Sequence, residues 1–143
     1  MSYQIRRMTF QDIDEVVRLE NDLLGETLGK EMLEEELNRQ ILTLLVALDN
    51  DKIIGYLSSY FLDGEGEIYN FVVDRSYQRQ GIGTLLLNET IRMNKVKTIL
   101  LEVKESNLQA INFYLKNDFH QISIRKNYYN GKENALVFRR TIC

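Results

Sequence analysis

The spacing of hydrophobic residues along the chain switches between a period of about 2, typical of strands, and about 3.6, typical of helices. Residues 3–8 alternate and predict a first strand, whereas Ile13, Val16, Val17 and Leu19 follow a helical repeat. The same comparison over the rest of the chain predicts strands at 3–8, 42–48, 53–62, 68–74, 98–103, 118–124 and 134–140, and helices at 13–24, 31–39, 84–93 and 110–115.

The order of these segments is strand, two helices, three strands, helix, strand, helix and two strands, without a linker or an internal repeat. The short turns at 49–52 and 63–66 predict that the three central strands run antiparallel. The helix that follows them provides the longer connection that a parallel strand needs. We therefore predict one mixed α/β domain over residues 1–143.

The two N-terminal helices differ in character. Thr9 and Asp12 have the spacing of an N-cap and its acidic N3 partner, which predicts a helix that continues to about Leu24. The second helix is acidic, and we predict that Met32 and Leu37 face the core while most of its carboxylates lie in solvent. These carboxylates are Glu31, Glu34, Glu35 and Glu36. A solvated face is the favoured interpretation, and attraction of a cationic substrate is the alternative.

A glycine-containing loop joins the strand that ends at Asp74 to the next helix. Its residues are Gln78, Arg79, Gln80, Gly81, Ile82, Gly83 and Thr84. Glycine allows backbone N–H groups to converge at the positive end of the helix, which favours a phosphate ligand. No lysine follows Gly83, which excludes a P-loop, and Leu86 occupies the place of the third glycine of a dinucleotide-binding turn. A plain tight turn is the alternative.

Composition narrows the classes of function. The net charge of −3 argues against a nucleic-acid surface, and the chain has no apolar run that predicts a transmembrane helix or a signal peptide. Cys143 is the only cysteine, which fits a reducing cytoplasm, and His120 is the only histidine, so we expect no metal site. We predict a cytoplasmic protein, monomeric or weakly dimeric, without nucleic-acid or membrane partners.

The loop pattern Gln-x-x-Gly-x-Gly at 78–83 resembles the pyrophosphate loop of the GNAT superfamily of N-acetyltransferases. The stretches 101–107, 110–114 and 124–129 are similar to those of its RimI members, which acetylate the N-terminal alanine of a small-subunit ribosomal protein. The resemblance extends from about Gly66 to Phe138. It implies acetyl-CoA as cosubstrate and the GNAT fold, a mostly antiparallel sheet of about seven strands with about four helices.

Glu102 is the candidate catalytic base. It alternates with Leu101 and Val103 in a strand that we predict to be central and largely desolvated, where a carboxyl pKa should be raised toward neutrality. An α-amino group has a pKa near ~8 and must lose a proton before it attacks a thioester. The resemblance implies that Glu102 receives this proton, directly or through water. A strand carboxylate paired with lysine or arginine is the alternative.

The same resemblance assigns roles to other residues. It implies that Tyr114 protonates the departing thiolate, that Asn107 contacts CoA, and that the backbone of Phe71, Val72 and Val73 pairs with the pantetheine arm. Tyr128 and Tyr129 match a loop that lines the peptide groove. The alternatives are a core aromatic for Tyr114, a helix N-cap for Asn107, ordinary core side chains for 71–73, and a strand-end pair for the two tyrosines.

Two departures lie on the acceptor side. The region 21–28 lacks the Pro-Trp pair that is usual in the family, and Asn134 stands where an acidic residue is common. We therefore predict an acetyl-CoA-dependent enzyme that acetylates a protein N-terminus, with the ribosomal alanine as the preferred acceptor. An acetyltransferase for a small amine or a lysine side chain is the alternative among enzymes, and a non-catalytic CoA-binding module is the alternative from another class.

Overall fold

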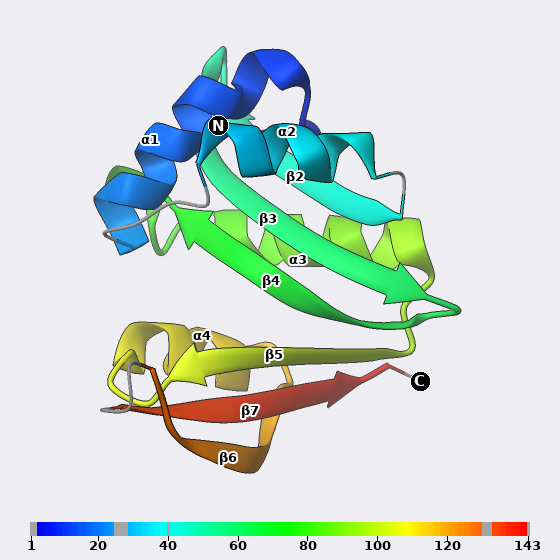
Figure 1. The fold of residues 1–143 in the computed structure, drawn as a ribbon, viewed down its shortest axis with the longest axis vertical. Coiled ribbons are helices and arrows are strands. Elements are labelled where there is room, and N and C mark those ends of the chain that lie inside the picture. The colour runs from blue at the N-terminus through cyan, green and yellow to red at the C-terminus, as the bar shows by residue number, and fades with distance from the viewer. Residues whose placement is uncertain (1–2, 25–28, 40, 130–132, 143) are drawn as a thin grey trace.

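The computed structural model describes residues 3–24, 29–39, 41–129 and 133–142. Within these ranges the chain forms one seven-stranded sheet and four α-helices (Figure 1). The strands are β1 (Gln4–Arg7), β2 (Leu42–Asp49), β3 (Lys52–Leu62), β4 (Glu65–Val73), β5 (Thr98–Lys104), β6 (His120–Tyr129) and β7 (Glu133–Thr141). The helices are α1 (Ile13–Leu24), α2 (Lys30–Asn38), α3 (Ile82–Asn94) and α4 (Leu108–Lys116), with 3-10 turns η1 (Phe10–Asp12) and η2 (Arg75–Tyr77).

The strand order is β1-β2-β3-β4-β5-β7-β6. The first four strands pair antiparallel in chain order, as the short turns between the central strands predict. β4 and β5 are parallel but pair only at Glu65–Glu67 and Thr98–Leu100, and beyond these residues the two strands diverge (Figure 1). The inner edge of β4 therefore carries backbone groups that no strand satisfies, directly beside the predicted phosphate loop.

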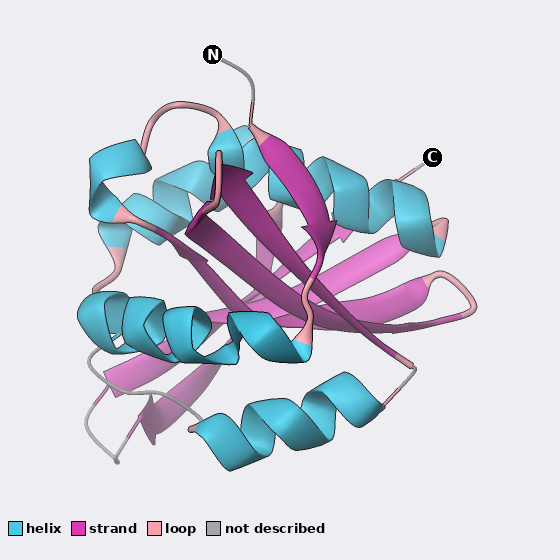
Figure 2. Ribbon diagram, turned by 90° about the horizontal axis from the view of Figure 1, so that it is seen from above, coloured by secondary structure: helices cyan, strands magenta, loops and turns pink. Residues whose placement is uncertain are grey.

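Helices cover both faces of the sheet (Figure 2). On one face, α3 and α4 bury Ile82, Leu86 and Tyr114 in a core that also contains Leu101 and Val103 of β5. On the other face, α1 and α2 cover a second core with residues such as Val16 and Leu33. Because side chains alternate along a strand, Glu102 faces away from the α3–α4 core.

The structure corrects two predictions in the acidic helix. Leu33 is fully buried and Leu37 packs beside it on the same core, whereas Met32 is 48% exposed. Leu33 and Leu37 are four residues apart and share one helix face, and Met32 lies about 100° away from Leu33. Glu36 is partly buried instead of lying in solvent.

The C-terminal hairpin is also longer than predicted, since β6 continues through Tyr128 and Tyr129 where the sequence analysis expected a loop. No α-helix of the described residues is both long and apolar enough to cross a membrane. The same residues contain no group of three or more His, Cys, Asp or Glu side chains that could hold a metal ion.

Candidate active site

A groove of about 1150 Å³ lies along the divergence of β4 and β5. It contains ten of the predicted cofactor-contacting residues, together with Tyr114. Those ten are Phe71, Val72, Val73, Gln78, Arg79, Gly81, Ile82, Gly83, Thr84 and Asn107. A smaller hollow of about 410 Å³ near the start of β6 and the end of β7 contains none of the predicted site residues.

The glycine loop has the geometry of an anion site. Gly81 is the residue before α3 and has a left-handed φ of 83°, with nothing within 4 Å of the position a Cβ would occupy. The first N–H groups of α3 have no partner within the helix, and the helix dipole is positive at this end. Arg79 also has a left-handed φ, of 66°. A phosphate can therefore approach the backbone closely here.

Gly83 is required for a different reason. A Cβ at this position would lie 3.0 Å from Cε1 and Cζ of Phe113 on α4. Phe113 in turn packs edge-on against Phe71 of β4, with ring centroids 5.5 Å apart. The second glycine thus lets α4 approach α3 and close one wall of the groove.

The groove is positively charged although the protein is acidic. Arg75, Arg79 and Lys116 line it, and none of the described residues that line it is Asp or Glu. The whole chain has a net charge of −3. Cationic side chains and free backbone N–H groups together favour a ligand that carries several negative charges, such as a pyrophosphate.

The glutamines of the loop serve its structure. Gln78 Nε2 donates to the carbonyl of Val73 at 2.9 Å and so ties the loop to the end of β4. Gln109 Nε2 on α4 donates to Oε1 of Gln78. Gln80 is the one predicted loop residue that does not line the groove, because its side-chain oxygen accepts a hydrogen bond from the Tyr3 hydroxyl.

Two residues have the structural role that was weighed as the alternative from the sequence, and both also line the groove. Asn107 caps α4, since its Oδ1 accepts from the N–H of Ala110 at 3.2 Å, and it also lines the groove. Tyr114 is a core aromatic, 8% exposed, with its ring 5.4 Å from that of Phe119, and it lines the groove as well. Burial raises the pKa of the Tyr114 phenol above its ordinary range, so this hydroxyl keeps its proton at neutral pH.

Glu102 is not in the environment predicted from the sequence. Its side chain is 28% exposed, and its Oε1 accepts a hydrogen bond from Nη1 of Arg125 at 2.6 Å. The carboxylate is therefore only partly desolvated, and the alternative of an arginine-paired carboxylate describes its contact. The hydrogen bond that Arg125 donates to Glu102 raises the pKa of Arg125. Glu102 lies two residues beyond the last pairing of β5 with β4, at the start of the divergence.

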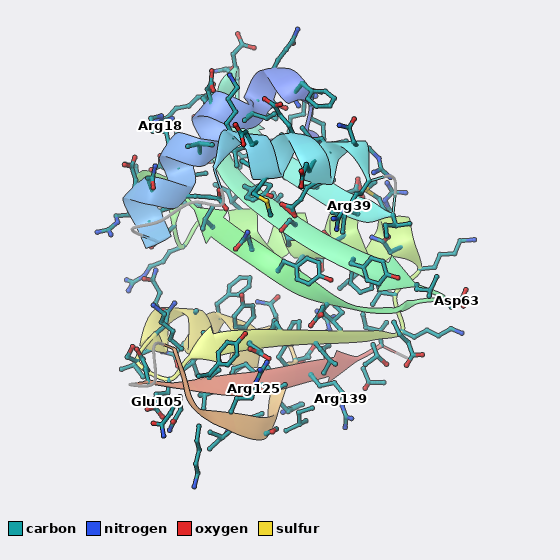
Figure 3. All side chains as sticks on the ribbon, viewed as in Figure 1. Arg18, Arg39, Asp63, Glu105, Arg125 and Arg139 are labelled. Atoms are coloured by element: carbon teal, nitrogen blue, oxygen red, sulfur yellow. The ribbon has the colours of Figure 1, made fainter. Side chains whose placement is uncertain are left out.

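Tyr128 completes this arrangement. The guanidinium carbon of Arg125 lies 3.9 Å from the centroid of the Tyr128 ring, which is a close cation–π contact. Figure 3 shows Arg125 beside β5 and β7, well separated from Arg139 on the same sheet. The backbone of Tyr129 ends β6, and its side chain lies outside the described residues.

Several groove residues were not found by the sequence analysis. Asn112 and Lys116 share a face of α4 because they are four residues apart, and this spacing was a usable signal. Arg75 stands in the turn directly before the loop. No local pattern indicated Arg125, which reaches Glu102 across β7.

The family model described as the acetyltransferase (GNAT) family matches residues 13–119, about three quarters of the chain. This protein belongs to the GNAT family. An N-alpha-acetyltransferase of Saccharolobus solfataricus is 26% identical to this GNAT protein over 156 aligned residues, covering 98% of this chain and 93% of the relative. The [ribosomal protein bS18]-alanine N-acetyltransferase of Escherichia coli is 36% identical over 94 residues, which cover 62% of this chain and 64% of the relative.

The solved structures agree with the GNAT fold. The crystal structure of the ribosomal-protein-S18-alanine N-acetyltransferase from Escherichia coli superposes with a TM-score of 0.88 at 26% identity, covering 99% of this chain and 94% of that one. The predicted class of fold, a seven-stranded sheet with four helices, is confirmed. So is the prediction of an enzyme: this GNAT protein is an acetyl-CoA-dependent acyltransferase close to the RimI group.

Proposed function

We propose that this protein transfers the acetyl group of acetyl-CoA to the N-terminal amine of a protein, with Glu102 as the base and Tyr114 as the acid. Relatives with both archaeal and bacterial origins are named for acetylation of protein N-termini. The alanine of ribosomal protein bS18 is the acceptor of the Escherichia coli relative, and a peptide that begins with this alanine is the first acceptor to test. Cytoplasmic location and a monomeric or weakly dimeric state stay predictions from the sequence.

The observation that carries the proposal is the cationic groove that ends beside Tyr114 and the β4 edge. Arg75, Arg79, Lys116 and the loop before α3 suit the phosphates of acetyl-CoA. The unpaired edge of β4 at Phe71–Val73 suits the amide groups of the pantetheine arm, which can pair with it as an added strand would. This arrangement directs the thioester toward Tyr114 and the divergence of β4 and β5.

The reaction is a direct displacement. The acceptor amine gives up a proton toward Glu102 and its nitrogen forms a bond to the acetyl carbonyl carbon. The carbon–sulfur bond then breaks, and the hydroxyl of Tyr114 donates a proton to the departing sulfur. The raised pKa of Tyr114 means that the phenol is fully protonated when this proton is needed. No covalent intermediate on the protein is required.

The test is release of free CoA thiol by the wild type and by Glu102→Gln. We expect Glu102→Gln to lower kcat by about 10²–10⁴-fold, the usual contribution of general base catalysis. The dissociation constant for acetyl-CoA should change little, because Glu102 does not line the cofactor groove. Glu67→Gln, which removes an exposed carboxylate from β4, is the matched control and should keep its activity.

The acceptors decide between the alternatives. A peptide with a free N-terminal alanine, the same peptide blocked at its N-terminus, and a polyamine are compared. Turnover with the free peptide alone supports N-terminal acetylation, whereas turnover with the polyamine alone moves the substrate to small amines. If acetyl-CoA binds and none of the three acceptors reacts, acetylation of a protein N-terminal alanine is refuted.

A further inference from the structure

The contact between Arg125 and Glu102 has a consequence for the reaction. A carboxylate positioned to accept a proton from an amine beside a bound thioester can also accept one from water. Attack by that water would form a carbon–oxygen bond and break the carbon–sulfur bond. The acetic acid keeps one proton of the water, Glu102 takes the other, and the Tyr114 hydroxyl protonates the departing CoA sulfur. An acetyltransferase that waits for a protein acceptor therefore needs its base restrained while the acceptor is absent.

Arg125 is suited to this restraint. Its Nη1 donates a hydrogen bond of 2.6 Å to Oε1 of Glu102, which occupies this oxygen and holds the carboxylate beside the guanidinium. The Arg125 side chain is 51% exposed, so its removal leaves no cavity in either core. The Arg125 guanidinium also stacks on the Tyr128 ring, near the C-terminal end of β6.

The backbone that carries this interaction departs from the regular ladder. β6 pairs with β7 at Arg125–Ala135 and next at Tyr129–Glu133, with a register shift between these two pairs. Within the shift, Asn127 has a left-handed φ of 55° and donates its N–H to Oδ1 of Asn134 at 2.9 Å. Asn134, which departs from the usual acidic residue of the family, thus holds the bulge that brings Tyr128 under the Arg125 guanidinium.

We propose that Arg125, held over Tyr128, is a positioning residue that restrains Glu102 until an acceptor binds beside Tyr128. This inference rests on the proposed function, because it takes Glu102 as the base. A polypeptide that packs against Tyr128 competes with the Arg125 guanidinium for the ring. Its backbone carbonyl oxygens also offer the guanidinium new hydrogen-bond partners. The guanidinium leaves Glu102, and the carboxylate becomes available to the amine of that same acceptor.

The experiment measures hydrolysis of acetyl-CoA without any acceptor, from the release of both acetate and free CoA thiol. We expect Arg125→Gln to raise this rate about tenfold or more, because the charge-assisted hydrogen bond that occupies the Glu102 carboxylate is lost. Arg125→Lys keeps a charge but loses the planar stacking on Tyr128, and its rate should lie between those of the wild type and Arg125→Gln. Arg139→Gln removes an exposed arginine from β7 and should leave the rate unchanged.

The double variant Glu102→Gln/Arg125→Gln provides the decisive comparison. This double variant should hydrolyse acetyl-CoA no faster than the wild type, because it lacks the Glu102 carboxylate that Arg125 restrains. A tenfold rise that persists in the double variant, a similar rise in Arg139→Gln, or no rise in Arg125→Gln would each refute the role of Arg125. Thermal unfolding of each variant verifies that the fold is kept.

This outcome is separate from that of the proposed function. If the wild type acetylates the peptide and Arg125→Gln does not hydrolyse acetyl-CoA faster, the role of Arg125 is refuted and the proposed function stands. If the wild type acetylates none of the acceptors but Arg125→Gln shows the Glu102-dependent rise, the restraint is supported and the proposed acceptor is refuted.

Discussion

Glu36 on α2 has a carboxylate oxygen, Oε1, that is buried and has no hydrogen-bond partner among the described residues. Burial raises the pKa of Glu36, and the negative charge of the buried Glu20 raises it further, while Arg39 opposes both effects. Glu36 is therefore not part of a solvated acidic face, and its buried charge lowers the stability of the fold.

We predict that Glu36→Gln stabilises the protein at neutral pH. The pKa of Glu36 in the folded protein is raised above the unfolded value near ~4.3, so protonated Glu36 contributes its full stabilisation only below pH ~4.3. This stabilisation is lost as the pH rises through the folded pKa. At pH 7 the amide should therefore increase the free energy of unfolding by about 1 kcal/mol, and the gain should shrink as the pH falls toward ~4. Urea denaturation at several pH values measures both effects.

Glu35→Gln is the matched control, since Glu35 is the exposed neighbour on the same helix. Its free energy of unfolding should stay within about 0.5 kcal/mol of the wild type. A gain for Glu36→Gln that is equal at all pH values would contradict the assignment to a buried charge, as would a loss of stability at pH 7.

Among the elements, β1 and η1 are joined by one strong interaction. Arg6 donates to both oxygens of Asp12, at 2.7 and 3.0 Å, and the N–H of Thr9 donates to Oδ2 at 2.8 Å. Burial alone would raise the pKa of Asp12, but these hydrogen bonds and the charge of Arg6 outweigh it, and the net pKa is lowered. The capping pair predicted from Thr9 and Asp12 is thus present, with an arginine added from β1.

We predict that Asp12→Asn lowers the free energy of unfolding by about 2 kcal/mol at pH 7, because it breaks a bidentate pair whose carboxylate side chain is only 9% exposed. Because the pKa of Asp12 is lowered in the folded protein, its carboxylate stabilises the fold at pH values above the unfolded pKa near ~3.9. This stabilisation is lost as the pH falls through the folded pKa. The difference between variant and wild type should therefore vanish in acid, as chemical denaturation at pH 7 and near pH 3 can measure. The matched control is Asp14→Asn, which changes a side chain that is 86% exposed and should leave the free energy of unfolding almost unchanged. An equal loss at both pH values, or for both variants, would refute the assignment.

The elements were predictable because their signals are local. The helical repeat of α1, the glycine loop before α3 and the N-cap at Asn107 all act within a few residues of the chain, and each lies where it was predicted. In α2 the prediction for Leu37 was right, but that for Met32 was wrong because Met32 and Leu33 are both hydrophobic, and only the packed core decides which one is buried. The length of β6 depends on its pairing with β7, which the sequence of β6 alone does not contain.

The site was predictable only as far as it is built from one segment. The loop and Tyr114 were found, and both line the groove. The pairing of Glu102 with Arg125 spans 23 residues and crosses an intervening strand at a register shift, so no pattern in the sequence indicates it. Arg75 of η2 and Lys116 of α4 also come from separate segments, so no single stretch of the sequence indicates that they line one groove.

At the scale of the whole molecule, the groove lies where the sheet is least continuous. β4 and β5 share only the three pairs from Glu65–Thr98 to Glu67–Leu100, and the groove residues come from β4 and α3 on one side and from α4 on the other. A ligand that binds both sides adds contacts that the two strands do not make. Ligand binding and the cohesion of the fold are therefore linked here.

We predict that acetyl-CoA at about 100 times its dissociation constant stabilises the protein by about 2.7 kcal/mol, because it binds the folded state alone. A chain of this size should then show a Tm higher by several degrees, as differential scanning calorimetry can measure. Lys116→Ala removes one cation from the α4 side of the groove, and a tenfold weaker affinity would reduce the gain at the same ligand concentration by about 1.4 kcal/mol. Arg139→Ala, outside the groove, should keep the full shift. Equal shifts for Lys116→Ala and the wild type would mean that α4 does not hold the phosphates, and no shift in any variant would exclude this groove as the acetyl-CoA site.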